Sequence, residues 1–283
     1  MELSIIIVNY NSKLLLEQCI DSIKKVTREI NTEIIVVDNN STDGSKEYLP
    51  ARITDVKFIF NDKNTGFAKA CNQGFKNSSG KYILFLNPDT ILTDTCLTDC
   101  ISFLETHSDA GAVGVRMLDG QGKFLKESKR GLPSSATSFY KLFGLASIFP
   151  TSTTFAKYYQ GYLPEKENNP VEVLSGAFIM IKREVFEKVN GFDEDFFMYG
   201  EDIDLSIRIT RSGYKNYYLG AISITHLKGG STVYGNKHIE DFYDAMNVFI
   251  KKHYSNSSGG QILFLKAGIA IRKLLAKAGL IFR

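Results

Sequence analysis

Polar side chains directly follow apolar, strand-like runs at three places in the first third of the sequence. The first run leads into residues 9–11 (Asn-Tyr-Asn), a second ends at Asp38, and a third is followed by residues 87–89 (Asn-Pro-Asp). A carboxylate at the end of a buried strand needs water, a metal or a ligand as its partner. Because the ligands of parallel α/β sheets bind beyond the carboxyl ends of the strands, this pattern predicts a binding cleft there.

The sequence contains no glycine-rich phosphate loop, neither Gly-x-x-x-x-Gly-Lys-Ser/Thr nor Gly-x-Gly-x-x-Gly. A bound diphosphate would then be neutralised by a divalent metal. Magnesium is commonly held by one or two carboxylates together with phosphate oxygens and water. Asp89 is the candidate ligand, and Mg²⁺ or Mn²⁺ is the expected cofactor.

Acidic and aromatic residues are concentrated between residues 191 and 204, where Glu201 and Asp202 stand side by side. Aromatic surroundings favour a partly desolvated carboxylate that can accept a proton during catalysis. The alternative is structural, because acidic residues are also stabilised in the first turn of a helix. His226 follows a later strand-like run, and a lone histidine is more typical of a structural residue than of a ligand.

Alternating strand-like and helical segments must position these residues. The strand-like runs are almost continuously apolar, which is typical of strands that are buried on both faces. Such strands joined through helices predict an α/β fold, with a mostly parallel central sheet and helices on both faces. The predicted strands are 3–8, 33–38, 56–61, 81–87 and 112–117, and the predicted helices are 13–26, 43–49, 66–77 and 93–106.

The second half of the sequence is less regular. Residues 127–170 are rich in Ser, Thr, Gly and Tyr, which predicts a long insertion of the kind that forms lids or binding loops. Beyond it, the predicted elements are strands 171–174 and 177–181 and helices 201–211, 237–253 and 261–278.

Taken in order, these segments resemble the family-2 inverting glycosyltransferases, in particular the rhamnosyltransferase-like branch, over residues 3–232. The resemblance implies the GT-A (nucleotide-diphospho-sugar transferase) fold. It divides the chain into two parts. The first is a GT-A domain, residues 1–235, with a nucleotide-binding half (1–117) and an acceptor and catalytic half (118–235). The second is a C-terminal helical extension, residues 236–283. The segments that carry it are 4–11, 37–44, 64–68 with Asn72 and Gly74, 87–89, 175–177, 191–208 and His226.

The resemblance assigns roles to residues of the nucleotide-binding half. Asp38 matches the acid that hydrogen-bonds the pyrimidine base, and Tyr10 matches an aromatic residue that packs near the base. Asp89 matches the second, metal-binding acid of the Asp-x-Asp motif, whose first position here is Asn87, as in the rhamnosyltransferase-like branch. The expected donor-binding residues are Tyr10, Asn11, Asp38, Asn40, Gly66, Asn87 and Asp89.

Asp202 matches the general base of the family, and Glu201 beside it is the second catalytic candidate. His226 matches a histidine that completes the metal site in some relatives, so Asp89 and His226 are the expected metal ligands. The candidate acceptor-binding residues are Tyr199, Lys129 and Arg130.

The implied reaction is metal-dependent, inverting transfer of a single sugar, by a hexosyltransferase. The branch favours L-rhamnose from dTDP-L-rhamnose and a saccharide acceptor, linked to polyprenyl diphosphate, in bacterial surface polysaccharide synthesis. UDP-linked galactose, N-acetylglucosamine or galactofuranose are alternative donors, because thymine and uracil differ by one methyl group. The sequence has no tryptophan, and therefore no Gln-x-x-Arg-Trp signature of processive synthases, which favours single additions.

Two other classes share parts of this pattern. A nucleotidyltransferase would also bind a sugar nucleotide and a metal, but that class usually begins with a glycine-rich loop and a basic residue, where this sequence has residues 9–12 (Asn-Tyr-Asn-Ser). A non-catalytic nucleotide-sugar-binding module would not need the carboxylates and the histidine that the resemblance assigns to catalysis and metal binding.

Charge and hydropathy limit the partners. The 283 residues carry a formal net charge of +3, which does not indicate a nucleic-acid partner. No apolar stretch is long enough to span a membrane and no leader is evident, so the expected location is the cytoplasm.

The C-terminal residues 261–283 contain five basic residues and no acidic residue. As a helix they would place apolar side chains such as Leu263, Ile271 and Leu274 on one face and basic side chains on the other. Such a helix is predicted to bind the inner face of the plasma membrane, near a lipid-linked acceptor. The alternative is that it packs on its own domain or on a second copy in a homodimer.

Overall fold

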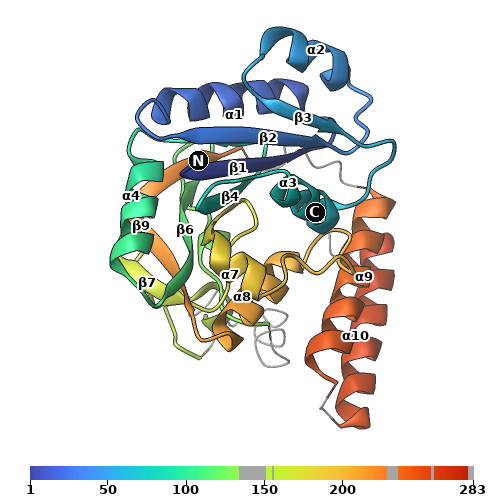
Figure 1. Cartoon of the computed structure of the whole chain (residues 1–283). Helices are drawn as coiled ribbons and strands as arrows, with labels where there is room; N and C mark the ends of the chain where they lie inside the picture. The colour runs from blue at the N-terminus through green and yellow to red at the C-terminus, as the bar shows by residue number, and fades with distance from the viewer. Residues whose placement is uncertain (134–150, 155, 228–234, 256–257, 280–283) are drawn as a thin grey trace.

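The computed structural model describes residues 1–133, 151–154, 156–227, 235–255 and 258–279 (Figure 1). Its centre is one mixed β-sheet with the strand order β3-β2-β1-β4-β8-β6-β9-β5, and β7 pairs with β9. Four parallel strands form its N-terminal half: β1 (Leu3–Asn9), β2 (Thr32–Asp38), β3 (Lys57–Phe60) and β4 (Tyr82–Leu86). The mostly parallel α/β architecture predicted from the sequence is confirmed.

The register of the parallel strands brings their polar ends together. Asn9 at the end of β1 lies beside Asp38 at the end of β2. On the other side of β1, Ile7 pairs with Leu86, the last residue of β4, so Asn87 leaves the sheet at the same edge. Three strand ends that are distant in sequence therefore line one edge of the sheet.

Helices cover both faces of the sheet (Figure 1). Successive residues of β1 alternate between the faces, so that Ile5 and Ile7 pack in one apolar cluster while Ile6 and Val8 pack in another. Burial of these two apolar clusters removes their side chains from water, which is the main stabilising term. The first cluster includes side chains of α1 (Lys13–Val26) and α4 (Cys96–Thr106), and the second includes those of α3 (Phe67–Lys76), α7 (Arg183–Lys188) and α8 (Glu201–Arg211). Helix α2 (Ser45–Arg52) follows β2.

The second half of the sheet mixes strand directions. β8 is antiparallel to both β4 and β6, whereas β6 and β9 run parallel. The strand predicted at 171–174 lies earlier in the sequence, as β7, which ends at residue 171. The short strand β5 was not predicted. The strands concerned are β5 (Thr90–Ile91), β6 (Ala110–Leu118), β7 (Asn168–Val171), β8 (Phe178–Lys182) and β9 (Lys215–His226).

The predicted insertion, 127–170, is only partly described. Two short 3-10 helices, η1 (Lys126–Ser128) and η2 (Lys157–Tyr159), belong to this region. Residues 134–150 of the insertion lie outside the described part of the chain, so its expected role as a lid or binding loop stays a prediction.

The C-terminal helices α9 (Asn236–His253) and α10 (Gly259–Lys277) pack on each other as a hairpin along one side of the domain (Figure 1). Their contact is a separate apolar cluster that includes Tyr243, Ile250 and Ile269. None of the helices in the described ranges is long and apolar enough to cross a membrane. Helices α9 and α10 thus form a two-helix unit, and the predicted domain boundary at residue 235 stays a prediction.

Candidate active site

The strand ends of β1 and β2 form a hydrogen-bonded pair. Asn9 Nδ2 donates to Asp38 Oδ2 over 2.7 Å, and the backbone N–H of Ser41 donates to Asp38 Oδ1 over 2.8 Å. Asn9 and Asp38 are almost completely buried. A carboxylate oxygen can accept two hydrogen bonds, so each oxygen of Asp38 is oriented by the protein and retains capacity for one more donor.

Two asparagines with left-handed backbone conformations shape the turns at this edge. Asn11 has φ 56° and Asn40 has φ 64°, a region that asparagine tolerates better than most residues. Asn11 Oδ1 accepts from the Thr42 N–H over 2.7 Å, and the Asn11 N–H donates to Ser41 Oγ over 2.9 Å. These bonds tie the two turns together and leave the ring of Tyr10 43% exposed.

Gly66 joins the start of α3 to a segment far along the chain. Its φ is 87°, and a Cβ at this position would lie 2.5 Å from the carbonyl oxygen of Phe197. The N–H of Phe67 donates to that same carbonyl over 2.7 Å. Only glycine allows this close approach, which brings residues 197–199 to the start of α3.

Asp89 and His226 meet where β5 pairs with β9. His226 Nε2 lies 3.2 Å from Asp89 Oδ1, and both side chains are buried. The antiparallel pairing of Thr90 with His226, and a 2.8 Å hydrogen bond from the Leu227 N–H to the Asp89 carbonyl, hold the two residues together. The two residues assigned to a metal site by the resemblance thus lie side by side, and their role as metal ligands stays a prediction.

The pair fits a divalent metal that has few protein ligands. The buried His226 Nδ1 has no hydrogen-bond partner among the described residues, and within the same residues no group of three or more His, Cys, Asp or Glu side chains is arranged to hold a metal. One carboxylate and one imidazole would therefore be the protein donors to a metal at this position. Such a set leaves most of the coordination shell to diphosphate oxygens and water, as magnesium and manganese sites often do.

Asp202, in the first turn of α8, is held by three donors. Its Oδ2 accepts from the guanidinium of Arg130 and from the Gly176 N–H over 3.0 Å, and its Oδ1 accepts from the Ile203 N–H over 2.8 Å. The next residue after Gly176, Ala177, accepts a 3.0 Å hydrogen bond from the Asn87 N–H. Two consecutive residues thus connect the end of β4 to the Asp202 carboxylate.

Glu201 differs from its neighbour. Its side chain is buried, and burial, followed by the negative charge of Asp202, raises the pKa of Glu201 to about 8. At neutral pH Glu201 therefore keeps its proton, while Asp202 pairs with Arg130. The two adjacent carboxyl groups thus differ in environment: Asp202 pairs with Arg130, whereas burial dominates at Glu201.

The three candidate acceptor residues are placed differently from expectation. Lys129 is buried, and its ammonium donates to the backbone carbonyls of Gln160, over 2.9 Å, and Leu163. Burial lowers the pKa of Lys129. The sequence suggested that Lys129 and Arg130 could meet an acceptor phosphate; instead, Lys129 joins two parts of the insertion and Arg130 reaches inward to Asp202.

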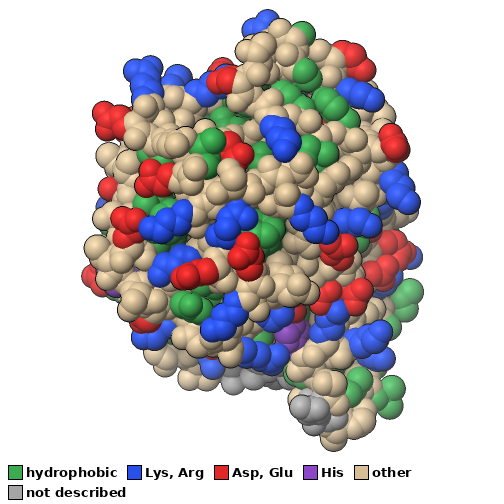
Figure 2. Space-filling model, in the orientation of Figure 1, with side chains coloured by type: hydrophobic (Ala, Val, Ile, Leu, Met, Phe, Trp, Pro, Cys, Tyr) green, Lys and Arg blue, Asp and Glu red, His purple; other side chains and the backbone are tan. Residues whose placement is uncertain are grey.

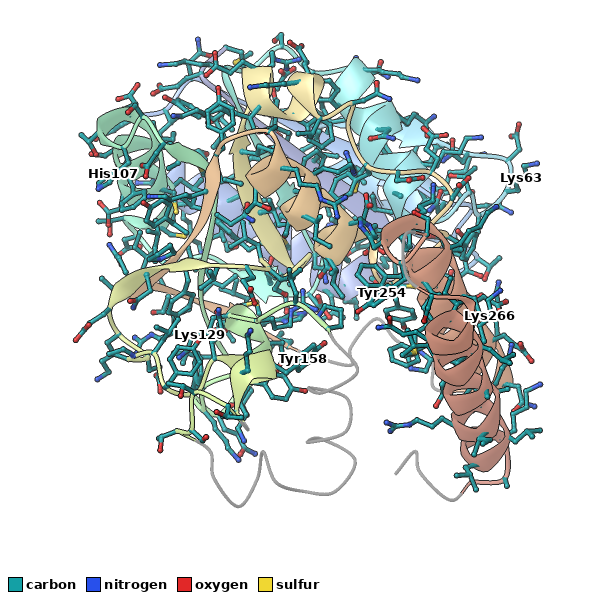
Figure 3. All side chains as sticks on the ribbon, turned by 90° about the horizontal axis from the view of Figure 1, so that it is seen from below. Lys63, His107, Lys129, Tyr158, Tyr254 and Lys266 are labelled. Carbon is teal, nitrogen blue, oxygen red and sulfur yellow. The ribbon has the colours of Figure 1, made fainter. Side chains whose placement is uncertain are left out.

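Figure 3 shows Lys129 beside Tyr158, in the lobe across from the C-terminal hairpin. Tyr199, the third candidate, has φ 70°, and its hydroxyl lies 2.7 Å from His238 Nδ1 at the start of α9. It therefore belongs to the contact between the α8 region and the hairpin.

Sequence reasoning missed the ion pairs that join distant segments. Arg130 and Asp202 are 72 positions apart, and no local spacing marks their contact. His253 and Asp204 are 49 positions apart and lie 2.8 Å from each other. The Asp204–Arg208 pair, by contrast, had a signal in the sequence, because its four-residue spacing places both side chains on one helix face.

Comparison with known proteins agrees with this geometry. The sequence description of glycosyl transferase family 2 matches residues 4–189, and that of the N-terminal domain of galactosyltransferase matches residues 163–232. The N-acetylglucosaminyl-diphospho-decaprenol L-rhamnosyltransferase of Mycobacterium tuberculosis is 27% identical over 241 residues, which are 81% of this chain and 77% of that protein. Rhamnosyltransferase WbbL of Escherichia coli is 26% identical over 216 residues, 73% of this chain and 78% of that protein.

A solved structure shows the same fold. The mannosyltransferase PcManGT from Pyrobaculum calidifontis, in complex with GDP-Man and Mn²⁺, aligns with a TM-score of 0.59 at 17% identity, covering 98% of this chain and 72% of that one. The family match spans most of the chain. This chain therefore belongs to glycosyltransferase family 2 and has the GT-A fold.

Proposed function

We propose that this glycosyltransferase transfers one L-rhamnose unit from dTDP-L-rhamnose, with inversion, to a saccharide linked to polyprenyl diphosphate, in bacterial surface polysaccharide synthesis. Two rhamnosyltransferases among its relatives, one of them named for an N-acetylglucosaminyl-diphospho-decaprenol acceptor, support this donor and acceptor. The observation that carries the proposed chemistry is the link from the end of β4 to Asp202 through Gly176 and Ala177.

The donor nucleotide would bind at the ends of β1 and β2. Asp38, oriented by Asn9, accepts a hydrogen bond from the imide N–H of the pyrimidine, and the exposed ring of Tyr10 packs near the base. Asn11 and Asn40 shape the turns beside the base, and the close backbone at Gly66 shapes the far side of the cleft.

The donor diphosphate would lie beside Asp89 and Asn87, at the end of β4. Asp89 and His226 would hold a divalent ion there, which when bound supplies positive charge beside the departing diphosphate. The chain itself supplies a buried carboxylate from the turn before β5 and an imidazole from the end of β9, so the two meet only in the folded sheet.

Asp202 acts as the general base in this proposal. It takes the proton from an acceptor hydroxyl, whose oxygen attacks the anomeric carbon on the face opposite the nucleoside diphosphate. The new glycosidic bond forms as the bond to the diphosphate breaks, so configuration inverts in one displacement. Burial raises the pKa of Glu201, so less of its carboxyl group is ionised at neutral pH, which favours Asp202 as the proposed base.

The hairpin would place the enzyme at the inner face of the plasma membrane. On α10, Leu263, Ile271 and Leu274 are 70%, 58% and 68% exposed, and Figure 2 shows hydrophobic side chains at the free end of the hairpin. Lys266 lies on the outer side of the hairpin (Figure 3). An exposed apolar stripe beside basic residues suits an anionic lipid surface.

The helix is not arranged wholly as its sequence suggested. Lys273 and Lys277, expected on a free basic face, pair with Glu240 of α9, and Lys273 also pairs with Asp244 over 3.0 Å. The helix thus packs on its own chain, as the alternative interpretation held, while its apolar stripe faces outward. Residues 280–283, which complete the predicted basic tail, lie outside the described part.

The reaction is tested with the variant Asp202→Asn. With dTDP-L-rhamnose, Mn²⁺ and a synthetic N-acetylglucosaminyl-diphospho-polyprenol, its kcat should fall about 10²–10⁴-fold, the usual contribution of a general base. Its donor affinity, measured by calorimetry, should stay unchanged. Asp99→Asn, an exposed acid on α4, serves as the matched control.

Transfer at the wild-type rate by Asp202→Asn would place the base elsewhere. A thermal-shift screen of dTDP- and UDP-sugars identifies the donor, since the tightest ligand gives the largest stabilisation. A UDP-sugar that stabilises more than dTDP-L-rhamnose would replace the proposed donor and leave the reaction class intact.

A further inference from the structure

Arg130 is a buried cation for which the proposed reaction has no role so far. Its side chain is 13% exposed, and its segment is fixed by backbone hydrogen bonds. The Arg130 N–H donates to the Val173 carbonyl over 3.3 Å, and the Val173 N–H donates back over 2.9 Å. Arg130 therefore lies on an isolated two-residue bridge between the insertion and the segment that leads from β7 to Gly176.

One nitrogen of this guanidinium serves two acceptors. Nη2 donates to the Asp202 carboxylate and, over 2.7 Å, to the carbonyl of Leu174. Burial alone would lower the pKa of Arg130, but the Asp202 carboxylate raises it above its usual value, so the cation is permanent. Gly176, two residues after Leu174, donates to the same oxygen of Asp202. Arg130 therefore fixes both the carboxylate and the loop that carries its other donor.

The acidic residues in the first turn of α8 have different partners. Asp204 has its own cations, Arg208 on the same helix and His253 from α9. Glu201 is neutral at physiological pH. Tyr158, from the insertion, also interacts with Arg130. Among the described residues, Arg130 is thus the cation that pairs with Asp202.

We propose that Arg130 is a positioning residue for the base, which holds Asp202 Oδ2 against Gly176 so that the orientation of the carboxylate towards the acceptor is fixed. The inference rests on the proposed function of Asp202 as the base. A fixed orientation matters because misplacement of a reacting group by about 1 Å can cost about 10²-fold in rate. Arg130 itself touches neither donor nor acceptor in this assignment.

The test compares Arg130→Met with Arg130→Lys. Methionine keeps much of the side-chain volume without the charge, and lysine keeps the charge as a point donor. Arg183→Met is the matched control. Arg183 is also a partly buried arginine that donates hydrogen bonds to oxygens, over 2.6 Å to the Gly80 carbonyl and over 2.9 Å to Ser78 Oγ. It lies where the chain enters β4, away from the polar strand ends.

The first readout does not depend on activity. Hydrogen exchange of backbone amides should show lost protection at residues 174–176 and 201–203 in Arg130→Met, and retained protection in Arg130→Lys. Arg183→Met should leave both segments protected while lowering the melting temperature. Unchanged exchange at 174–176 in a folded Arg130→Met protein would overturn the proposal.

The second readout is the split between kcat and KM. With dTDP-L-rhamnose and the N-acetylglucosaminyl-diphospho-polyprenol probe, Arg130→Met should lose about 10²-fold in kcat, with the donor KM nearly unchanged. Added guanidinium at millimolar concentration should restore part of kcat to Arg130→Ala, and not to Arg183→Ala. A rise in donor KM without a fall in kcat would show a donor-binding role instead.

The background of Asp202→Asn separates this inference from the proposed function. If Asp202 is the base and Arg130 acts through it, adding Arg130→Met to Asp202→Asn should cause no further loss of the residual rate. A further loss in the double variant would show that Arg130 acts independently of Asp202. Full activity of Asp202→Asn alone would instead contradict the proposed base. It would also contradict the positioning role of Arg130 in catalysis, whatever the hydrogen exchange of the amides at 174–176 shows.

Discussion

His253, the last residue of α9, places its Nε2 2.8 Å from Oδ1 of Asp204 in α8. Burial alone would raise the pKa of Asp204, but His253 and Arg208 hold it below its usual value. Nearby, Lys252 pairs with Asp193 and Asp195, each over 2.6 Å. The helix that begins with the proposed base is therefore bonded directly to the C-terminal hairpin.

Replacing His253 with alanine should destabilise the whole domain. Removing one partner of a buried carboxylate costs about 1–3 kcal/mol, and Asp204 would keep Arg208 as its remaining cation. Urea unfolding at pH 7 measures this loss. The neighbouring Lys251→Ala, an exposed site on the same helix, should change stability by less than about 0.5 kcal/mol. Equal effects of the two substitutions would contradict the buried contact.

Glu201→Gln should change how stability depends on pH. The folded-state pKa of Glu201, about 8, lies above its ordinary value of 4.5, so the folded protein holds a proton that the unfolded chain releases. The stabilisation of the folded state by this bound proton is complete below about pH 4.5. It declines as pH rises and is lost through pH 8. Glutamine is uncharged at every pH, so the variant should match wild type near pH 5 and exceed it by a few kcal/mol near pH 9. Urea unfolding across pH 5–9 measures the difference, and parallel curves would contradict the buried, protonated state.

Gly66→Ala should weaken donor binding as well as stability. A Cβ would lie 2.5 Å from the Phe197 carbonyl, and the backbone would be strained at φ 87°. Gly122→Ala is the control, because Gly122 has φ 80° and nothing within 4 Å of its Cβ position. Both variants should lose about 1 kcal/mol from backbone strain, but only Gly66→Ala should lose more and bind dTDP more weakly. Calorimetry and thermal unfolding of both proteins decide this.

Asp89→Asn should remove the effect of metal on donor binding. In wild type, Mn²⁺ should increase the thermal stabilisation by dTDP-L-rhamnose, and EDTA should reverse that increase. In Asp89→Asn the stabilisation should be the same with and without Mn²⁺, and His226→Gln should retain part of the difference, because a carboxylate is the stronger ligand for a hard cation. Asp99→Asn should behave as wild type. A full metal response in Asp89→Asn would place the metal elsewhere.

The double variant Leu263→Asp/Leu274→Asp should lose binding to vesicles. Both side chains are exposed, so the fold should tolerate the change, while charge on an apolar stripe opposes entry into the lipid interface. Co-sedimentation with vesicles containing anionic lipid measures binding, and Gln261→Asp on the same helix is the control. If the double variant instead dissociates a dimer in light scattering and sediments like wild type, the stripe is a contact between two copies.

Local sequence patterns are enough to predict much of the nucleotide-binding half. The predicted helix 13–26 has the bounds of α1, and the predicted helix 201–211 has those of α8, because amphipathic spacing and glycine stops are local signals. The polar ends of β1, β2 and β4 are recognisable because parallel strands impose a common edge. Direction within the sheet is not predictable in the same way: β8 is an apolar strand like β4, and nothing in its sequence indicates that it runs the opposite way.

The contacts of the site depend on tertiary structure that single segments do not encode. Lys129 and Arg130 are adjacent basic residues, and in the sequence both resemble solvent-facing candidates for binding an acceptor. In the fold one is buried among backbone carbonyls and the other pairs with Asp202. Burial of a lysine or arginine is uncommon enough that sequence alone favours exposure.

The attachment of the hairpin to α8 also has a geometric consequence. Helix α10 has 19 residues, so at about 1.5 Å per residue it is about 28 Å long. If its outward apolar stripe rests on lipid, the hairpin would fix the height and the tilt of the catalytic cleft above the bilayer. Relatives whose acceptors carry longer glycans would then need a C-terminal hairpin of different length or angle.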